Sequence, residues 1–265
     1  MSILVMYAMD SGHIGKVDKG SLSHQTLFEL FVDGIDDKSK ILNAEGGVQD
    51  ISELLSVTLN DKEDVIGVSL ADVVRGGSLQ LQWLPPTVEE VKLPSCELSG
   101  ALDLEVLPEA LEKLDLSENR FDGEISLVRL PDGLQILDLC INLLCGTLDL
   151  EHLPTHMREL HLDDNRFDGS VCLTNLPRSL KLLGLSSNLL SGTVDLRRLP
   201  PSIYELFLNE NKGLEGYTDF TRLPESLYFL FVARTNLEGC LKISRKGMLP
   251  KSFEVYDSKV QLFSD

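Results

Sequence analysis

Apolar and polar residues alternate along this chain with a long, regular period. Leu-Pro pairs recur in register at eight positions, with successive gaps of 23, 23, 23, 23, 23, 24 and 26 residues, and a ninth pair, Leu93-Pro94, falls outside this register. The eight pairs in register begin at Leu84, Leu107, Leu130, Leu153, Leu176, Leu199, Leu223 and Leu249. A fixed period of this size is typical of a solenoid, in which each repeat buries its apolar face against its neighbours. The sequence therefore predicts one continuous stack of repeats.

Each repeat also has a fixed internal pattern. One unit contains, in order, Leu134, Leu137, Leu139, Asn142, Leu144, Gly146, Leu148, Leu150 and Leu153 with Pro154. Two leucines separated by one residue share a face of a short strand, so stacked repeats should form a parallel sheet. We expect the Asn amide to bond to backbone groups of the turn after the strand. The Gly should permit a conformation that a Cβ obstructs, and the Pro should occupy the corner before the next strand.

The repeat pattern weakens at both ends, as expected of units that cover the core of a solenoid. A degenerate first unit begins at Val65, and Val73 replaces its Asn. Near the other end Thr235 stands at the Asn position, extra residues occupy 242–248, and residues 253–257 predict a last imperfect strand.

These boundaries divide the chain into two parts. Residues 65–265 are predicted to hold about eight full or degenerate repeats and a C-terminal cap strand, and residues 1–64 an N-terminal cap. Within that cap we expect a disordered start and two short helices. The first helix is predicted over Thr26–Asp33 from its apolar face, and the second at Leu54-Leu55 from the capping pattern Asp50-Ile-Ser-Glu53. Residues 10–24 and 34–49 are expected to form loops.

The pattern L-x-x-L-x-L-x-x-N-x-L/F-x-G resembles the leucine-rich repeat signature over about residues 50–257. The G-x-x-x-L element, as in Gly146–Leu150 and Gly192–Leu196, resembles the plant-type class of this family. The resemblance implies an α/β-type repeat solenoid, a right-handed superhelix with a parallel concave β-sheet and a second short strand behind it. Because two helices are predicted within residues 1–64, we expect the N-terminal cap to be helical. The Leu-Pro start and 23-residue length are similar to trypanosomatid leucine-rich repeat proteins.

The cysteine pattern bears on the compartment. The plant-type extracellular cap resembles C-x-W-x-G-V-x-C, but in the matching stretch Ser52 and Leu59 replace both cysteines. The chain has five cysteines, an odd number, and no Asn-x-Ser/Thr glycosylation acceptor. We therefore expect an intracellular, cytoplasmic protein with free thiols.

Charge and hydropathy limit the classes of partner. The formal net charge is −18, and binding of nucleic acid needs basic patches that release phosphate counterions. No apolar run approaches the roughly 18 residues of a membrane span. The apolar run Ile3–Met9 is short and follows no basic residue, so a cleaved signal peptide is the less favoured reading. We expect no nucleic acid and no membrane insertion.

No motif in the chain indicates catalysis. A phosphate loop, a nucleophile elbow and an H-E-x-x-H motif are all absent from the sequence. His152, His156 and His161 fall at different corners of one repeat, which favours surface histidines over a metal site. The carboxylates Asp115, Asp138, Asp163 and Asp164 favour an acidic surface over an acid–base pair. The turn cysteines Cys140 and Cys145 are interpreted as half-buried thiols. We predict no enzyme activity, no metal and no cofactor.

The outward positions of the concave sheet carry the candidate site. The N-terminal and middle repeats are polar there, with Asp138 and His161 among them. The C-terminal third gathers aromatic side chains with an aliphatic neighbour: Tyr204, Phe207, Tyr228, Phe229, Phe231 and Leu182. Exposed contiguous aromatic residues commonly mark interaction sites. The alternative is that the segment 253–263 folds over these rings as a cap.

The sequence thus predicts a non-catalytic module that binds another protein through its concave face. Two alternatives stay open. The chain could be a structural subunit of a larger cytoskeletal or organellar assembly, or the recognition part of an enzyme-regulating complex.

Overall fold

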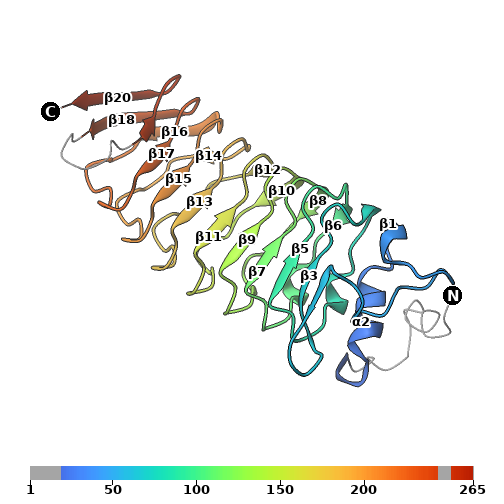
Figure 1. The fold of residues 1–265 in the computed structure, drawn as a ribbon. Coiled ribbons are helices and arrows are strands. Elements are labelled where there is room, and N and C mark those ends of the chain that lie inside the picture. Colours follow the sequence, from blue (N-terminus) through green and yellow to red (C-terminus); the bar gives the residue numbers. More distant parts are fainter. Residues whose placement is uncertain (1–18, 244–251, 265) are drawn as a thin grey trace, which may run out of the picture.

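The repeats form an elongated stack of parallel strands (Figure 1). The computed structural model describes residues 19–243 and 252–264. The predicted disordered start, with Ile3–Met9, and most of the extra residues at 242–248 lie outside the described residues. Figure 1 shows the blue N-terminal end and the red C-terminal end at opposite ends of the stack.

One wall of the stack is a ten-stranded sheet, which we call the long sheet. Its strands, in spatial order, are β2 (Val57–Leu59), β3 (Val65–Ser69), β5 (Glu90–Lys92), β7 (Lys113–Asp115), β9 (Ile136–Asp138), β11 (Glu159–His161), β13 (Leu182–Gly184), β15 (Glu205–Phe207), β17 (Phe229–Phe231) and β19 (Ser252–Glu254). β2 pairs with β3 in antiparallel fashion, and the strands from β3 to β19 pair in parallel. The predicted parallel sheet is confirmed.

A second wall of short parallel strands lies behind the long sheet, as the plant-type resemblance implies. One four-stranded sheet contains β6 (Ser99–Ala101), β8 (Arg120–Glu124), β10 (Leu143–Thr147) and β12 (Arg166–Asp168). Another contains β14 (Ser191–Gly192), β16 (Gly213–Tyr217), β18 (Asn236–Ile243) and β20 (Lys259–Ser264). The leucines of each repeat fill the space between the walls, and Leu134, Leu137 and Leu139 are fully buried.

The Leu-Pro pair makes the corner that leads into each strand of the long sheet from β5 to β17. The carbonyl of Pro131 accepts a hydrogen bond from the N–H of Leu134, and Pro154 and Met157 are joined in the same way. Proline suits the first position because its φ is fixed and it has no N–H to leave unpaired. The regular spacing of Leu-Pro therefore sets the start of the strands from β5 to β17.

A ladder of buried asparagines holds successive repeats together. Asn165 donates from Nδ2 to the carbonyls of Leu162 and Asp163 in its own repeat and of Leu139 in the repeat before. Its Oδ1 accepts from the N–H of Leu144, also in the repeat before, at 3.1 Å. The equivalent buried residues, which bond in the same manner, are Asn119, Asn142, Asn188 and Asn211. The predicted role of the Asn is confirmed, and it extends to the neighbouring repeat.

At the ends of the ladder, smaller side chains replace the amide. Cys96 stands at the Asn position, and its thiol donates to the carbonyls of Pro94 and Leu70. The hydroxyl of Thr235 donates to the carbonyl of Val232. These side chains lack the reach of an amide, so the terminal repeats have fewer bonds between units.

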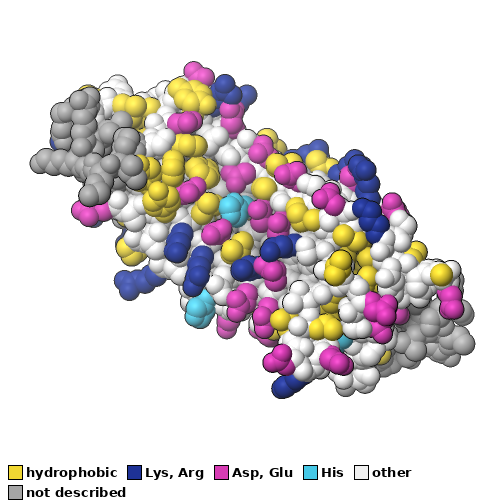
Figure 2. Space-filling view, viewed as in Figure 1, with side chains coloured by type: hydrophobic (Ala, Val, Ile, Leu, Met, Phe, Trp, Pro, Cys, Tyr) yellow, Lys and Arg dark blue, Asp and Glu magenta, His cyan; other side chains and the backbone are white. Residues whose placement is uncertain are grey.

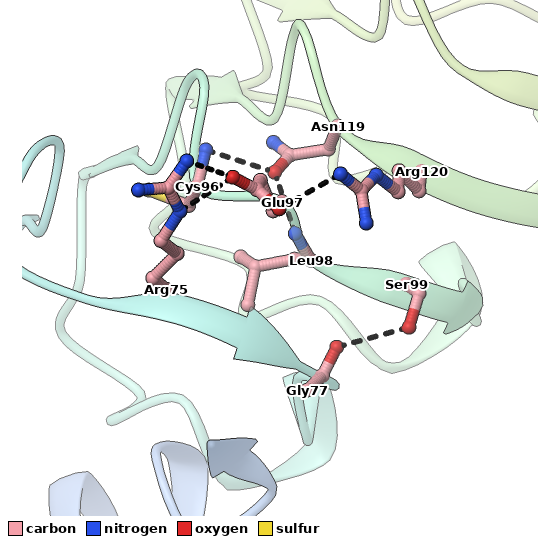
Figure 3. A network of polar contacts seen from close by, with 8 residues as sticks. All are labelled: Arg75, Gly77, Cys96, Glu97, Leu98, Ser99, Asn119 and Arg120. Carbon is pink, nitrogen blue, oxygen red and sulfur yellow. Dashed lines mark hydrogen bonds and ion pairs between the residues drawn. The ribbon is translucent and has the colours of Figure 1, made fainter. Parts of the chain in front are cut away.

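The first repeats are also joined by a surface network (Figure 3). The Glu97 carboxylate lies between the guanidinium groups of Arg75 and Arg120, and the Arg120 Nη2 to Glu97 Oε2 distance is 2.7 Å. Beneath it, Asn119 Oδ1 accepts from the N–H groups of Cys96 and Leu98. Exposed ion pairs contribute little free energy, so the buried amide is the stronger tie.

The N-terminal cap packs on the first repeats through one helix and two strands. The helix α2 (His24–Phe31) buries Leu27, Phe28 and Phe31 and begins at Ser23, whose hydroxyl accepts from the N–H of Thr26. β1 (Ile35–Asp37) pairs in antiparallel fashion with β4 (Arg75–Gly77). Short 3-10 helices lie at Lys19–Ser21, Ser39–Ile41, Leu81–Trp83 and Leu104–Val106. A Cβ on Gly77, where φ is +84°, would lie 2.2 Å from the Gly34 carbonyl oxygen, so this pairing requires glycine.

The second predicted helix is wrong. Residues 51–56 form turns, and Leu55 is fully exposed. Asp50 Oδ1 accepts from both the N–H and the hydroxyl of Ser52, which closes a local turn instead of a helix cap. The chain then enters β2 at Val57, because pairing with β3 covers the first edge of the long sheet.

We predict that Asn165→Ala lowers the free energy of unfolding by more than about 2 kcal/mol. The substitution leaves the buried N–H of Leu144 and several carbonyls without a partner, and each orphaned group costs about 1–3 kcal/mol. The measurement is a urea titration of both proteins. Asn175→Ala is the matched control, since Asn175 is exposed and donates only to the Glu151 carbonyl. Equal losses in the two variants would contradict the role of the ladder.

Candidate partner-binding face

The outward side chains of the long sheet form columns, because each strand places equivalent residues beside one another. Adjacent strands in a sheet are about 4.8 Å apart. Phe207 pairs in register with Phe231, and Glu205 pairs with Phe229. Between these outward residues, Leu206 and Leu230 point into the core and are fully buried. The strand alternation therefore brings the aromatic residues of two repeats to one face.

Five rings in β15 and β17, or one residue before them, form a connected set of ring contacts, and we call them the aromatic patch: Tyr204, Phe207, Tyr228, Phe229 and Phe231. The rings of Tyr204 and Tyr228 are stacked, with centroids 5.3 Å apart. Phe229 meets both tyrosines edge to face, and Phe207 lies 5.0 Å from Phe231. Edge-to-face and offset pairs are the favoured arrangements of aromatic rings.

The aromatic patch is accessible to solvent. Tyr204 is 42% exposed, and the other four residues are partly exposed. Figure 2, which shows the long sheet from the same side as Figure 1, shows apolar side chains gathered near its C-terminal end. Charged side chains cover the middle of the same face.

The structure places the other predicted residues at increasing distances from the aromatic patch. Leu182 lies one strand from Glu205, on the same face. His161 is in the column of Phe207 but two strands away, and Asp138 is three strands away, or about 14 Å. Leu182 therefore borders the patch, whereas Asp138 belongs to the polar middle of the face.

The described part of the C-terminal segment extends both walls of the stack. β19 continues the long sheet, where Ser252 and Glu254 stand beside Phe229 and Phe231. β20 pairs in parallel with β18 in the second wall. In this arrangement residues 252–264 lie beside the aromatic patch in the stack and do not cross its face.

A partly buried carboxylate next to the patch has a role that the sequence did not predict. Asp163 reaches toward the following repeat, where its Oδ1 accepts from the N–H and the hydroxyl of Ser186 at 2.8 and 2.5 Å. Burial raises the pKa of the Asp163 carboxyl. A Cβ on Gly184 would lie 1.9 Å from Asp163 Oδ2, so the carboxylate occupies the space of a missing side chain between His161 and Phe207.

Other repeats show why Asp163 takes this position. Asp115 Oδ1 accepts from the N–H and hydroxyl of Ser117, two residues later in the same repeat. In its own repeat Gly184 occupies the position equivalent to Asp115, and it has no side chain that could accept these hydrogen bonds from Ser186. Asp163 supplies the acceptor from the preceding repeat instead. The signal in the sequence is the exchange of an Asp for a Gly together with a new Asp 21 residues earlier.

The other candidate chemistry has structural roles. His152 pairs with Asp149, His156 approaches the Asp132 carbonyl, and His161 approaches Glu159. In the described residues, no three His, Cys, Asp or Glu side chains come together in a way that could hold a metal ion.

The Cys140 thiol has surroundings that disfavour a thiolate. Burial and the neighbouring Asp138 raise its pKa, so it stays protonated at neutral pH.

An open hollow on the second wall, away from the aromatic patch, is lined by small and acidic residues that include Thr147, Asp149, Cys172 and Asp195. Neither feature resembles an active site.

Comparisons with known proteins identify the fold. No family model and no curated protein matches the chain. Among solved structures, the PEPR1–AtPEP1 complex superimposes with a TM-score of 0.61 and 24% identity, over 82% of this chain and 32% of that one. The chain has the leucine-rich repeat fold. It spans about a third of the PEPR1 chain that it matches.

Two further solved structures resemble this chain and are matched over different shares of their own length. The Arabidopsis receptor kinase HAESA, in complex with the peptide hormone IDA and the co-receptor SERK1, gives a TM-score of 0.57 and 19% identity, over 89% of this chain and 50% of that one. A plant ice-binding protein gives 0.52 and 17%, over 91% and 94%. At these identities the likeness concerns the fold alone. Within the described residues, no helix is both long and apolar enough for a membrane span.

We predict that Gly184→Ala lowers stability by about 1–3 kcal/mol, because its Cβ displaces the Asp163 carboxylate. Gly184→Asp and Asp163→Ser should each lower stability alone. The double variant should recover most of that loss, since it recreates the bonding of Asp115 to Ser117. Chemical denaturation of the single and double variants measures the coupling between the two sites. Simple addition of the single effects would show that Asp163 does not substitute for the missing side chain.

Proposed function

We propose that this leucine-rich repeat chain is a non-catalytic recognition module that binds a partner protein through the aromatic patch. The observation that carries the proposal is the contact of five partly exposed rings on a face whose core is already filled by leucines. Interface hot spots are enriched in aromatic residues and surrounded by more polar contacts. The patch and the charged middle of the long sheet have this arrangement.

The shape of the site supports a macromolecular partner. Small-molecule sites are concave and enclose most of their ligand, whereas the aromatic patch lies on the open face of a sheet. Leu182, Asp138 and His161 extend the proposed contact surface along that face. The PEPR1 and HAESA structures are described as complexes with AtPEP1 and with a peptide hormone and co-receptor, which supports recognition of protein for this fold.

We also propose a cytoplasmic location for this activity. All five cysteines are free in the structure, and one of them, Cys96, is buried in the ladder as a thiol. A reducing compartment suits such a chain. The likeness to trypanosomatid repeat proteins stays a prediction.

We predict that Phe207→Ala and Phe231→Ala abolish partner binding and leave the fold intact. Truncation of a buried interface aromatic costs more than about 2 kcal/mol of binding free energy. The measurement compares the thermal stability of each variant with the amount of partner protein that the variant retains from an extract of the native source. Asp138→Ala should change mainly the salt dependence of association, because it removes a peripheral charge.

Two control variants distinguish loss of binding from loss of stability. Tyr217→Ala removes an aromatic ring that is 73% exposed on the second wall, and it should retain the same proteins as the unmodified chain. Leu208→Ala removes a buried leucine and should lower stability by about 2–5 kcal/mol. If the two Phe variants lose as much stability as Leu208→Ala, the rings serve the core and the proposed function is wrong.

A further inference from the structure

The aromatic patch contains one carboxylate that has no partner. Glu205 lies on the outward face of β15, between Leu182 on one neighbouring strand and Phe229 on the other. Its side chain is partly exposed, and among the described residues it makes no hydrogen bond and no ion pair. Lys181 lies beside Tyr204 on the neighbouring repeat, where its carbonyl accepts from the N–H groups of Tyr204 and Glu205, and among the described residues its ammonium group forms no ion pair with Glu205. Glu205 therefore contributes nothing evident to folding.

More carboxylates border the patch. Asp163 lies over Gly184, next to Phe207 in the column, and Glu254 stands beside Phe231. Within the described residues the Glu254 carboxylate also has no cationic partner. The faces of aromatic rings carry negative charge density, so rings and carboxylates together attract a cation. Glu205 thus places a carboxylate among the rings, and further carboxyl groups lie at two edges of the patch.

The protein already uses this combination of groups once. The guanidinium of Arg234 lies 5.7 Å from the centroid of the Tyr256 ring and pairs with the carboxylates of Glu210 and Asp257. One arginine is there satisfied by a ring and two carboxylates. In the aromatic patch the rings and the carboxylates are present, and among the described residues no cation pairs with Glu205 or Glu254 or lies over these rings.

We propose that the aromatic patch receives an arginine or lysine side chain, carried on an apolar segment of the partner protein. The ammonium or guanidinium group would pair with Glu205 and lie against the rings of Tyr204 and Phe229. The apolar neighbours of that side chain would cover Phe207, Phe231 and Leu182. This inference rests on the proposed function, and it adds the chemistry that selects the partner.

The test uses three blocked pentapeptides of the form glycine-leucine-X-leucine-glycine, where X is arginine, citrulline or glutamate. Citrulline keeps the shape of arginine and removes its charge. We expect the arginine peptide to bind at least tenfold more tightly than the other two in a calorimetric titration. Glu205→Gln should remove this preference and leave the affinity for the citrulline peptide unchanged.

A control separates the site from the general charge of the protein. Glu215→Gln removes an exposed carboxylate of the second wall, and it should keep the full preference for arginine. If Glu205→Gln and Glu215→Gln reduce arginine binding equally, the attraction is non-specific and the inference is overturned. Equal binding of the arginine and citrulline peptides would overturn it as well.

The result can also be distinguished from failure of the proposed function. Sedimentation of the unmodified chain and of Phe231→Ala shows whether the patch joins two copies of this chain. Self-association that is lost in Phe231→Ala, with no preference for arginine, would overturn the inference and keep the patch as an interface. The proposed function itself fails only if the Phe variants destabilise the fold as Leu208→Ala does.

Discussion

Burial of backbone groups in the turn after each strand is the constraint on which this structure depends. The turn lies inside the stack, where no water can satisfy its N–H and C=O groups, and an unpaired group there is costly. In the five central repeats one asparagine, such as Asn142, meets this requirement with bonds to its own turn and to the turn before it. The position of each of these repeats relative to the one before it follows from that amide. The straight columns of the long sheet, including the aromatic patch, are a result of this registration.

Much of the fold could be predicted because residues one repeat period apart in the sequence are neighbours on the same face of the stack. Once Leu206 and Leu230 are assigned to the core, the residues beside them must face outward as neighbours. The contact between Phe207 and Phe231 follows from counting 24 residues along the chain. The roles of the asparagine, the glycine and the Leu-Pro corner follow from the backbone chemistry of those residue types. Whether the rings bind a partner is a question of energetics, which the pattern does not contain.

The errors and omissions occur where the period does not apply. The N-terminal cap has no repeat, so the strand pairing of Val57 with Val68 could be read only from a short alternation of apolar residues. Asp50 resembles a helix cap because the same carboxylate bond to a nearby N–H also closes a turn. Asp163 was predicted to belong to an acidic surface, and its bond to the next repeat was missed for a different reason. Its partner Ser186 lies in the next repeat, and a comparison of equivalent positions does not reveal which side chain reaches across.

One backbone position has the same unusual conformation in every repeat. Ser95, Glu118, Ile141, Asp164, Ser187, Glu210, Arg234 and Asp257 all have φ between 52° and 61°. Most residue types avoid this left-handed region, and a β-branched residue such as Ile141 avoids it strongly. The N–H of Ile141 donates to the Asp163 carbonyl of the next repeat, so stacking and not local propensity imposes the conformation. Selection can therefore change the charge, size and polarity of this column one repeat at a time, while the path of the chain stays the same.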